Sequence, residues 1–259
     1  MQPDLAIIEQ WAKEAGAILR EGYGKRIHID LKGPVDLVTE VDHASEDLLV
    51  RHIQGRFPGH TIITEEAGHL AGGAEDCWYI DPLDGTINYA HGLPLFAVSI
   101  AYMRKKQVVL GVIFDPMRDE LFSAESGAGA RLNGKPIRVS GITDLISSLL
   151  VTGFPNEDWT NDRTNLQYFE IFSRISQGVR RLGSAAYDLC AVASGRLDGF
   201  WESHLKPWDI AAGALIVQEA GGIVSDLDGE PRYMDPPYNI IAANAALHPQ
   251  LVRALKNGR

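Results

Sequence analysis

One stretch decides how this chain is interpreted, WYIDPLDGTIN at residues 78–88. An apolar, β-prone run, Cys77–Ile80, leads into it and ends at Asp81 and Pro82. Proline has no N–H for a sheet ladder and pushes the preceding residue toward extended geometry, so we expect Asp81 at the end of a strand. Asp84-Gly85-Thr86 then predicts a turn and a helix start, where converging backbone N–H groups bind oxyanions.

The two carboxylates of this stretch, Asp81 and Asp84, are close enough to repel each other. A hard divalent cation removes the conflict, and oxygen ligands favour Mg²⁺ or Mn²⁺ over Zn²⁺. The alternative is an ordinary turn, since Leu-Asp-Gly recurs at 197–199 and 227–229. Those two copies lack counterparts of Asp81, Thr86 and Asn88, so the first copy is interpreted as a metal and phosphate site.

Further acids follow strand-like runs or precede helices. Glu65 and Glu66 come directly after an apolar pair, and Asp42 and Asp209 fall where helical patterns begin. Each has a structural alternative: a glutamate is favourable in the first turn of a helix, and an aspartate at a helix start is most simply an N-cap. Because ligand sites in layered proteins gather at strand ends and helix starts, we expect these carboxylates to converge.

The hydrophobic periodicity predicts two groups of elements. Helical patterns cover residues 3–22, 42–56, 163–177, 184–195, 208–220 and 247–257. Strand-like runs separated by turn residues predict an antiparallel meander over 96–104, 108–115, 120–123 and 130–132. A second series of strands is expected at 149–153, 199–202, 222–225 and 238–242.

Composition bounds the class of protein. With 259 residues and 45% hydrophobic content the chain can bury a large core, and its formal charge of −10 disfavours binding to nucleic acid or to anionic membranes. Cys77 and Cys190 are interpreted as buried, reduced thiols. Residues 1–22 are amphipathic rather than a signal sequence, and no apolar run is long enough to span a bilayer, so the default expectation is a cytoplasmic protein.

Two motifs resemble those of the inositol monophosphatase family of magnesium-dependent, lithium-sensitive phosphatases. The first occupies residues 78–89 and the second runs from WDIAAGA at 208–214 to EAGG at 219–222. The similarity extends to residues 36–42, 65–66 and 183–186, and so covers essentially the whole chain in order. It implies an α+β fold, the layered α-β-α-β-α sandwich of the sugar phosphatases, forming a single domain (1–259) with approximate lobes 1–144 and 145–259.

The resemblance also implies a set of metal ligands for two to three Mg²⁺ ions. Glu65, Asp81 and the backbone carbonyl of Leu83 would bind the first ion. Asp81, Asp84 and Asp209 would bind a second, and a third, weaker ion would again use Glu65, which is therefore counted among the catalytic residues.

The same resemblance assigns the catalytic and phosphate-binding groups. Gly85 and Thr86 would offer backbone N–H groups to the phosphate. The Thr86 hydroxyl and Asp42 would form a dyad that activates water, so no phosphoenzyme is needed. Glu66 would support the metal ligands without binding a metal ion itself. Ile87 departs from the second threonine of many relatives, which questions any side-chain role at that position.

Recognition of the leaving alcohol is assigned to Ala185, Glu202 and Asp209, with Asp188 or Lys206 nearby. A carboxylate such as Glu202 accepts hydrogen bonds from a polyol, although a solvated residue at a strand end is the alternative. Arg180 and Arg181 attract anions or are ordinary surface residues.

The family-level substrate is myo-inositol monophosphate. Relatives with the same metal core cleave fructose 1,6-bisphosphate, histidinol phosphate or adenosine 3′,5′-bisphosphate, and a regulatory binding protein on the same fold is the non-enzymatic alternative. The resemblance further implies a homodimer.

Overall fold

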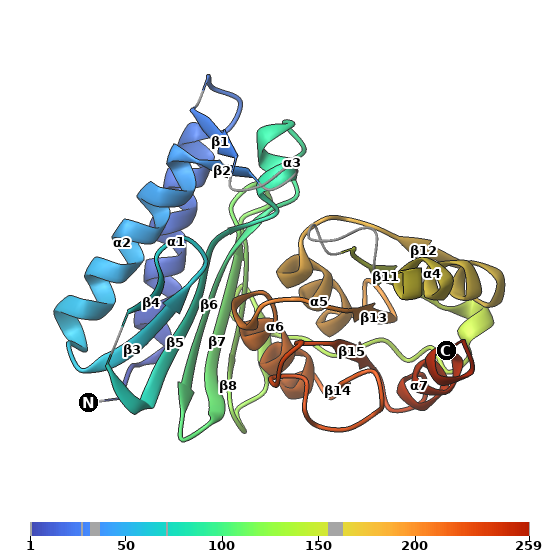
Figure 1. Cartoon of the computed structure of the whole chain (residues 1–259). Helices are drawn as coiled ribbons and strands as arrows, with labels where there is room; N and C mark the ends of the chain where they lie inside the picture. Colours follow the sequence, from blue (N-terminus) through green and yellow to red (C-terminus); the bar gives the residue numbers. More distant parts are fainter. Residues whose placement is uncertain (1, 27, 32–36, 71, 155–162, 259) are drawn as a thin grey trace.

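The computed structural model describes residues 2–26, 28–31, 37–70, 72–154 and 163–258. Its elements stack as helices, sheet, helices, sheet and helices (Figure 1), which confirms the layered α+β fold. The helices are α1 (Leu5–Gly22), α2 (Glu40–Arg56), α3 (Thr86–Ala90), α4 (Arg163–Ile175), α5 (Ala185–Ala193), α6 (Pro207–Glu219) and α7 (His248–Asn257), with a 3₁₀ turn η1 (Leu145–Ser147).

The larger sheet has the strand order β10-β9-β8-β7-β6-β5-β3-β4 among the described residues. Its neighbours pair antiparallel except β3 with β5, and the predicted meander is confirmed as β6 to β9. The strands are β3 (His60–Thr64), β4 (Gly68–Leu70), β5 (Gly73–Asp84), β6 (Ala97–Arg104), β7 (Gln107–Asp115), β8 (Glu120–Glu125), β9 (Ala130–Leu132) and β10 (Lys135–Pro136). A separate two-stranded sheet pairs β1 (Ile29–Leu31) antiparallel with β2 (Leu37–Thr39).

Both faces of this sheet are covered, because alternate side chains of β6 enter different cores. Val98, Ile100 and Tyr102 pack in the core beneath α1 and α2, whereas Ala97 and Ala101 pack in the core shared with α5 and α6. Helix α1 contributes Ile8, Trp11, Ala15 and Leu19 at helical spacing, and Asp4 caps it by accepting a hydrogen bond from the Ala6 N–H at 2.8 Å.

The smaller sheet has the order β12-β11-β13-β15-β14 in the described chain and lies between α5 and α6 on one side and α4 and α7 on the other (Figure 1). Leu150, Trp201 and Ile241 of this sheet face the outer helices, where Trp201 packs on Phe172 with ring centroids 4.4 Å apart. Its strands are β11 (Leu149–Thr152), β12 (Gly178–Arg180), β13 (Gly199–Glu202), β14 (Ile223–Ser225) and β15 (Ile240–Ala243).

The middle helices are buried on every side because a sheet covers each face. All residues of α5 are buried, and α6 is buried continuously from Ile210 to Val217. Small residues let α6 approach the larger sheet: a Cβ at Gly111 of β7 would lie 2.9 Å from the Ala212 carbonyl oxygen and 3.1 Å from its Cα.

Gly111→Ala is therefore expected to lower the free energy of unfolding by about 1–3 kcal/mol, since α6 must move away from β7. Urea unfolding measures the change. The matched control is Gly55→Ala in α2, where a Cβ meets no atom within 4 Å and an alanine is expected to stabilise the helix by about 0.5–1 kcal/mol. Equal stability of the two variants would contradict this account of the middle layer.

The structure corrects the prediction that the strand ends at Asp81. Strand β5 continues to Asp84, and its pairing with β6 shifts register between Asp81, opposite Ser99, and Asp84, opposite Ala97. The extra residue is accommodated as a bulge around Pro82, which has no N–H to pair. Asp81 thus lies within a strand, and the bulge redirects the chain into the Asp84-Gly85 turn.

The expected N-caps are also wrong in position. Helix α2 begins at Glu40 with Thr39 as its N-cap, and α6 begins at Pro207 after Lys206. Asp42 and Asp209 are instead the third residues of their helices. Each accepts a hydrogen bond from the N–H of the residue before its helix: Asp42 from Thr39 at 2.9 Å and Asp209 from Lys206 at 2.8 Å. Each therefore caps its helix from the third helical residue.

Cys77 and Cys190 are buried and free, as expected. A search of the described helices finds none with the length and apolar content needed to cross a bilayer.

Candidate active site

A cavity of about 700 Å³ is lined by residues from both halves of the chain. One wall comes from residues 37–87 and the other from residues 153–238. The predicted site residues that line it are Glu65, Asp81, Leu83, Asp84, Gly85, Thr86, Ala185, Glu202 and Asp209. The carboxylates that are distant in sequence therefore share one cavity.

Three different parts of the fold deliver the predicted metal ligands. Glu65 lies in the turn after β3, Asp81 and Asp84 lie before and after the bulge of β5, and Asp209 lies in the first turn of α6. The turn after β3 is tied to the same strand, because the Glu65 N–H donates to the Ile80 carbonyl at 3.3 Å.

Burial and mutual repulsion oppose ionisation of these acids. Burial, followed by the charges of Glu65, Asp84 and Asp209, raises the pKa of Asp81 well above its ordinary value. Burial and Asp84 do the same for the pKa of Asp209. Burial raises the pKa of Asp84 to about 6, although hydrogen bonds from Ser184 and nearby backbone lower it. Gathering carboxylates in a buried cavity is unfavourable unless a cation compensates their charge.

The donor set matches a magnesium site in kind, since carboxylate and carbonyl oxygens are hard ligands. Among the described residues, no group of three or more His, Cys, Asp or Glu side chains is already arranged to hold a metal ion. Protein donors orient them instead: the Leu83 N–H donates to Asp81 at 3.0 Å, and the Ser184 hydroxyl donates to Asp84 at 2.7 Å. A carboxylate has about four acceptor positions, so these bonds hold the acids without exhausting their capacity.

Asp42 and Thr86 are joined as expected. The Thr86 hydroxyl donates to Oδ1 of Asp42 at 3.1 Å, with the Leu83 carbonyl as an alternative acceptor at 3.0 Å. The other oxygen of Asp42 accepts the Thr39 N–H and the Thr39 hydroxyl. Asp42 is fully buried and lies behind Thr86, so it both caps α2 and reaches the cavity through the threonine.

The turn before α3 requires glycine. Gly85 has φ +96°, and a Cβ there would lie 3.0 Å from the Leu95 carbonyl oxygen and 3.3 Å from that of Gly183. A side chain at this position would combine backbone strain with close contacts. The chain can therefore pass beside the 183–186 segment only with glycine at this point.

The far wall contains the residues assigned to alcohol recognition. Glu202 is buried, so its alternative as a solvated strand end is wrong, and burial together with Asp84 raises its pKa to about 8, with Arg181 acting in the opposite direction. Asp188 and Lys206 also line the cavity. So does Arg181, whereas Arg180, at the end of β12, does not; both arginines are exposed.

Sequence reasoning missed Glu46, which holds the turn that carries Glu65 and Glu66. Its carboxylate accepts the Thr64 hydroxyl at 2.5 Å and the backbone N–H groups of Glu66 at 2.9 Å and Ala67 at 2.8 Å. Glu46 and Asp42 are four residues apart on the buried face of α2. An acidic pair at that spacing on the apolar side of a helix is the signal that would have found it.

Comparison with known proteins identifies the family of the chain. A family model described as the inositol monophosphatase family matches residues 1–259. The chain is 45% identical to the Nus factor SuhB of Escherichia coli (strain K12) over 98% of this chain and 95% of that protein. It is 41% identical to the inositol-1-monophosphatase of Mesorhizobium japonicum, over 97% and 96%. The crystal structure of the extragenic suppressor protein suhB from Bartonella henselae superimposes with a TM-score of 0.94 at 40% identity, covering 98% of both chains.

Proposed function

The chain belongs to the inositol monophosphatase family, and from that premise we propose that it is a magnesium-dependent hydrolase of small phosphate monoesters, with myo-inositol monophosphate as the preferred substrate. The observation that carries the proposal is the meeting of Glu65, Asp81, Asp84 and Asp209 in one cavity beside the Asp42–Thr86 pair. Because both halves of the chain line the cavity, the activity is assigned to the chain as a whole.

The proposed metal ligands follow the family pattern. Glu65, Asp81 and the Leu83 carbonyl would hold one Mg²⁺, while Asp81, Asp84 and Asp209 would hold a second; a third would use Glu65 again. When bound, the ions supply charge neutralisation at the phosphate and lower the pKa of water.

The side chains beside the phosphate cradle, which is the Gly85-Thr86 turn, would carry the proton. The Thr86 hydroxyl lies within hydrogen-bond distance of Asp42, and in the proposed mechanism it donates to Asp42 while its oxygen accepts a hydrogen bond from a water molecule. Thr86 would orient that water for in-line attack, and Asp42 would receive the proton through Thr86. Backbone N–H groups of Gly85 and Thr86 would bind the phosphate oxygens. No acidic side chain needs to become phosphorylated.

The alcohol would lie against Ala185, Glu202 and Asp209. Burial and repulsion favour the protonated form of Glu202, which both donates to and accepts from hydroxyl groups. A polyol presents several hydroxyls to such a wall, which supports an inositol ester over a simple alkyl phosphate.

A substrate panel tests the assignment. Phosphate release by the purified protein with Mg²⁺ is measured for inositol 1-phosphate, fructose 1,6-bisphosphate, histidinol phosphate and adenosine 3′,5′-bisphosphate. The expected result is the highest kcat/KM for the inositol ester, with inhibition by Li⁺. A higher kcat/KM for another ester would identify that ester as the preferred substrate and leave the proposed mechanism unchanged.

A regulatory binding role is the second candidate, because several relatives carry the name Nus factor SuhB. The complete acidic set of the cavity supports catalysis, and the two roles are compatible in one protein. We also propose a homodimer, as the family resemblance implies. Light scattering at twice the mass of one chain is the expected result, and the mass of a single chain would contradict it.

A further inference from the structure

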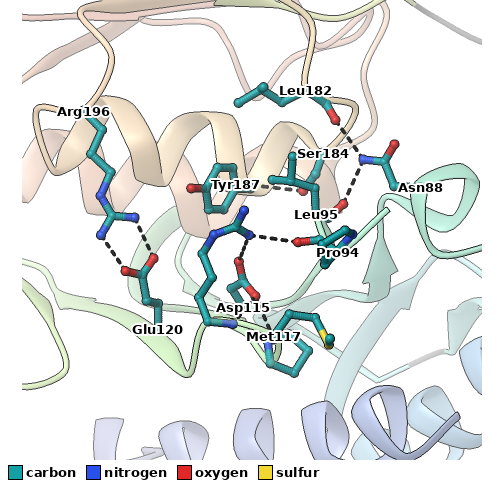
Figure 2. A network of polar contacts seen from close by, with 12 residues as sticks. Asn88, Pro94, Leu95, Asp115, Met117, Glu120, Leu182, Ser184, Tyr187 and Arg196 are labelled. Carbon is teal, nitrogen blue, oxygen red and sulfur yellow. Dashed lines mark hydrogen bonds and ion pairs between the residues drawn. The ribbon is translucent and has the colours of Figure 1, made fainter. Parts of the chain in front are cut away.

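Asn88 ends the stretch WYIDPLDGTIN and has no role in the proposed mechanism. It is the third residue of α3, and the residue is 5% exposed. Its Nδ2 donates to the carbonyls of Leu95 and Leu182, each at 2.8 Å, and is 3.4 Å from the carbonyl of Gly183 (Figure 2). One amide thus joins α3 to the segment that leads into α5.

Asp84 contacts the same segment as a hydrogen-bond acceptor, whereas Asn88 contacts it as a donor. Its Oδ2 accepts the Ser184 hydroxyl at 2.7 Å and the Ala186 N–H at 2.6 Å. Asp84 and Asn88 lie on either side of the Gly85-Thr86 turn in the sequence. Asn88 donates hydrogen bonds to carbonyls of residues 182–186, and Asp84 accepts hydrogen bonds from a hydroxyl and an N–H of the same segment. The proposed phosphate cradle and Ala185 of the far wall are therefore set against each other by two side chains.

The Asn88 amide packs closely against Gly183. Gly183 has φ +85°, and a Cβ there would lie 3.1 Å from both polar atoms of the Asn88 amide. On the other side, Gly85 lies against the carbonyls of Leu95 and Gly183, which Asn88 also contacts. Removing the Asn88 amide takes away both its hydrogen bonds and the atoms packed against Gly183, so the segment is left with space to shift relative to the cradle.

We propose that Asn88 is a positioning residue that keeps the alcohol-binding wall in register with the phosphate cradle, and thereby sets the preference for polyol esters. The inference rests on the proposed phosphatase activity and adds to it a determinant of substrate choice. A displacement of about 1 Å between reacting groups costs about 100-fold in rate. The loss falls on substrates whose alcohol uses the far wall, and less on those whose alcohol does not.

The chain offers a matched control at the other end of α5. Arg196, just beyond the helix, forms a bidentate ion pair with Glu120 of β8, with two N–O distances of 2.6 Å (Figure 2). This pair also joins the two halves of the chain, and neither residue lines the cavity. Arg196→Ala removes a comparable link without touching the cradle or the wall.

The experiment compares kcat/KM for inositol 1-phosphate with kcat/KM for p-nitrophenyl phosphate, a monoester without a polyol, in the full chain and in Asn88→Ala, Asn88→Ser and Arg196→Ala. The ratio of the two values is independent of the folded fraction, so loss of stability alone does not change it. We expect the ratio to fall about tenfold or more in Asn88→Ala, less in Asn88→Ser, which keeps one donor, and to stay unchanged in Arg196→Ala.

An unchanged ratio in Asn88→Ala, with the unsubstituted chain active, would overturn the positioning role and leave the proposed function standing. Failure of both Asn88 variants to fold while Arg196→Ala folds would assign Asn88 a purely structural role and also overturn it. Absence of release from both esters by the unsubstituted chain would overturn the proposed function, and this inference with it.

Discussion

Asp84→Asn is expected to lower kcat for Mg²⁺-dependent phosphate release by about 1,000-fold, because a ligand to a catalytic ion supplies several kcal/mol of transition-state stabilisation. The fold is expected to survive, since the asparagine oxygen can still accept the Ser184 hydroxyl and the Ala186 N–H. The substitution removes one negative charge from a buried cavity in which Asp81 and Asp209 repel it. The metal-free protein is therefore expected to gain about 1 kcal/mol in its free energy of unfolding.

Steady-state kinetics and urea unfolding without metal check both halves of this prediction. Asp228→Asn is the control, because it changes the aspartate of the third Leu-Asp-Gly triplet, which is exposed and does not line the cavity. The control is expected to keep the activity of the unsubstituted chain. Full activity in Asp84→Asn would remove Asp84 from the metal site.

Thr86→Val is expected to lower kcat by about 100-fold to 10,000-fold, the range that a lost general base contributes. Valine keeps the shape of threonine and removes the hydroxyl that donates to Asp42 at 3.1 Å. Helix α2 is expected to remain intact, because the other oxygen of Asp42 still accepts the Thr39 N–H. KM and the thermal midpoint are therefore expected to change little.

Thr86→Ser supplies the rescue, since it restores a hydroxyl at the same place. Activity within about tenfold of the unsubstituted chain is expected, well above Thr86→Val. The predicted order of kcat is therefore threonine, serine, valine. Equal losses in the serine and valine variants would contradict the role of the hydroxyl, because restoring it would then restore no activity.

Much of the fold follows from local patterns. Each predicted helix overlaps an observed one with bounds that differ by at most two residues, and the meander from residue 96 to 132 agrees with the structure within a few residues. These segments have clear periodicity and turn residues at their ends, and their packing does not conflict with it. The start of α3 was predicted at the Asp84-Gly85-Thr86 turn, although not its length of five residues, whereas strand β12 was missed because three residues carry too little pattern to be recognised.

The details of the cavity depend on tertiary contacts that local rules do not contain. Proline correctly indicated an interruption after Asp81, but only the pairing with β6 shows that the interruption is a bulge within β5. The aspartates at positions 42 and 209 correctly marked helix starts, yet both cap from the third residue. Glu46 and Asn88 were not given roles because, apart from Leu95, their partners are 18 to 95 residues away in sequence.

The central claim is that this cavity hydrolyses phosphate monoesters with magnesium. Its most direct test is the initial rate of phosphate release from inositol 1-phosphate by chelator-treated protein as free Mg²⁺ is raised from zero. The account predicts no release without the cation and a saturable increase as it is added. Release that is independent of Mg²⁺, or no release at saturating Mg²⁺ from this or any other monoester of the panel, would contradict it.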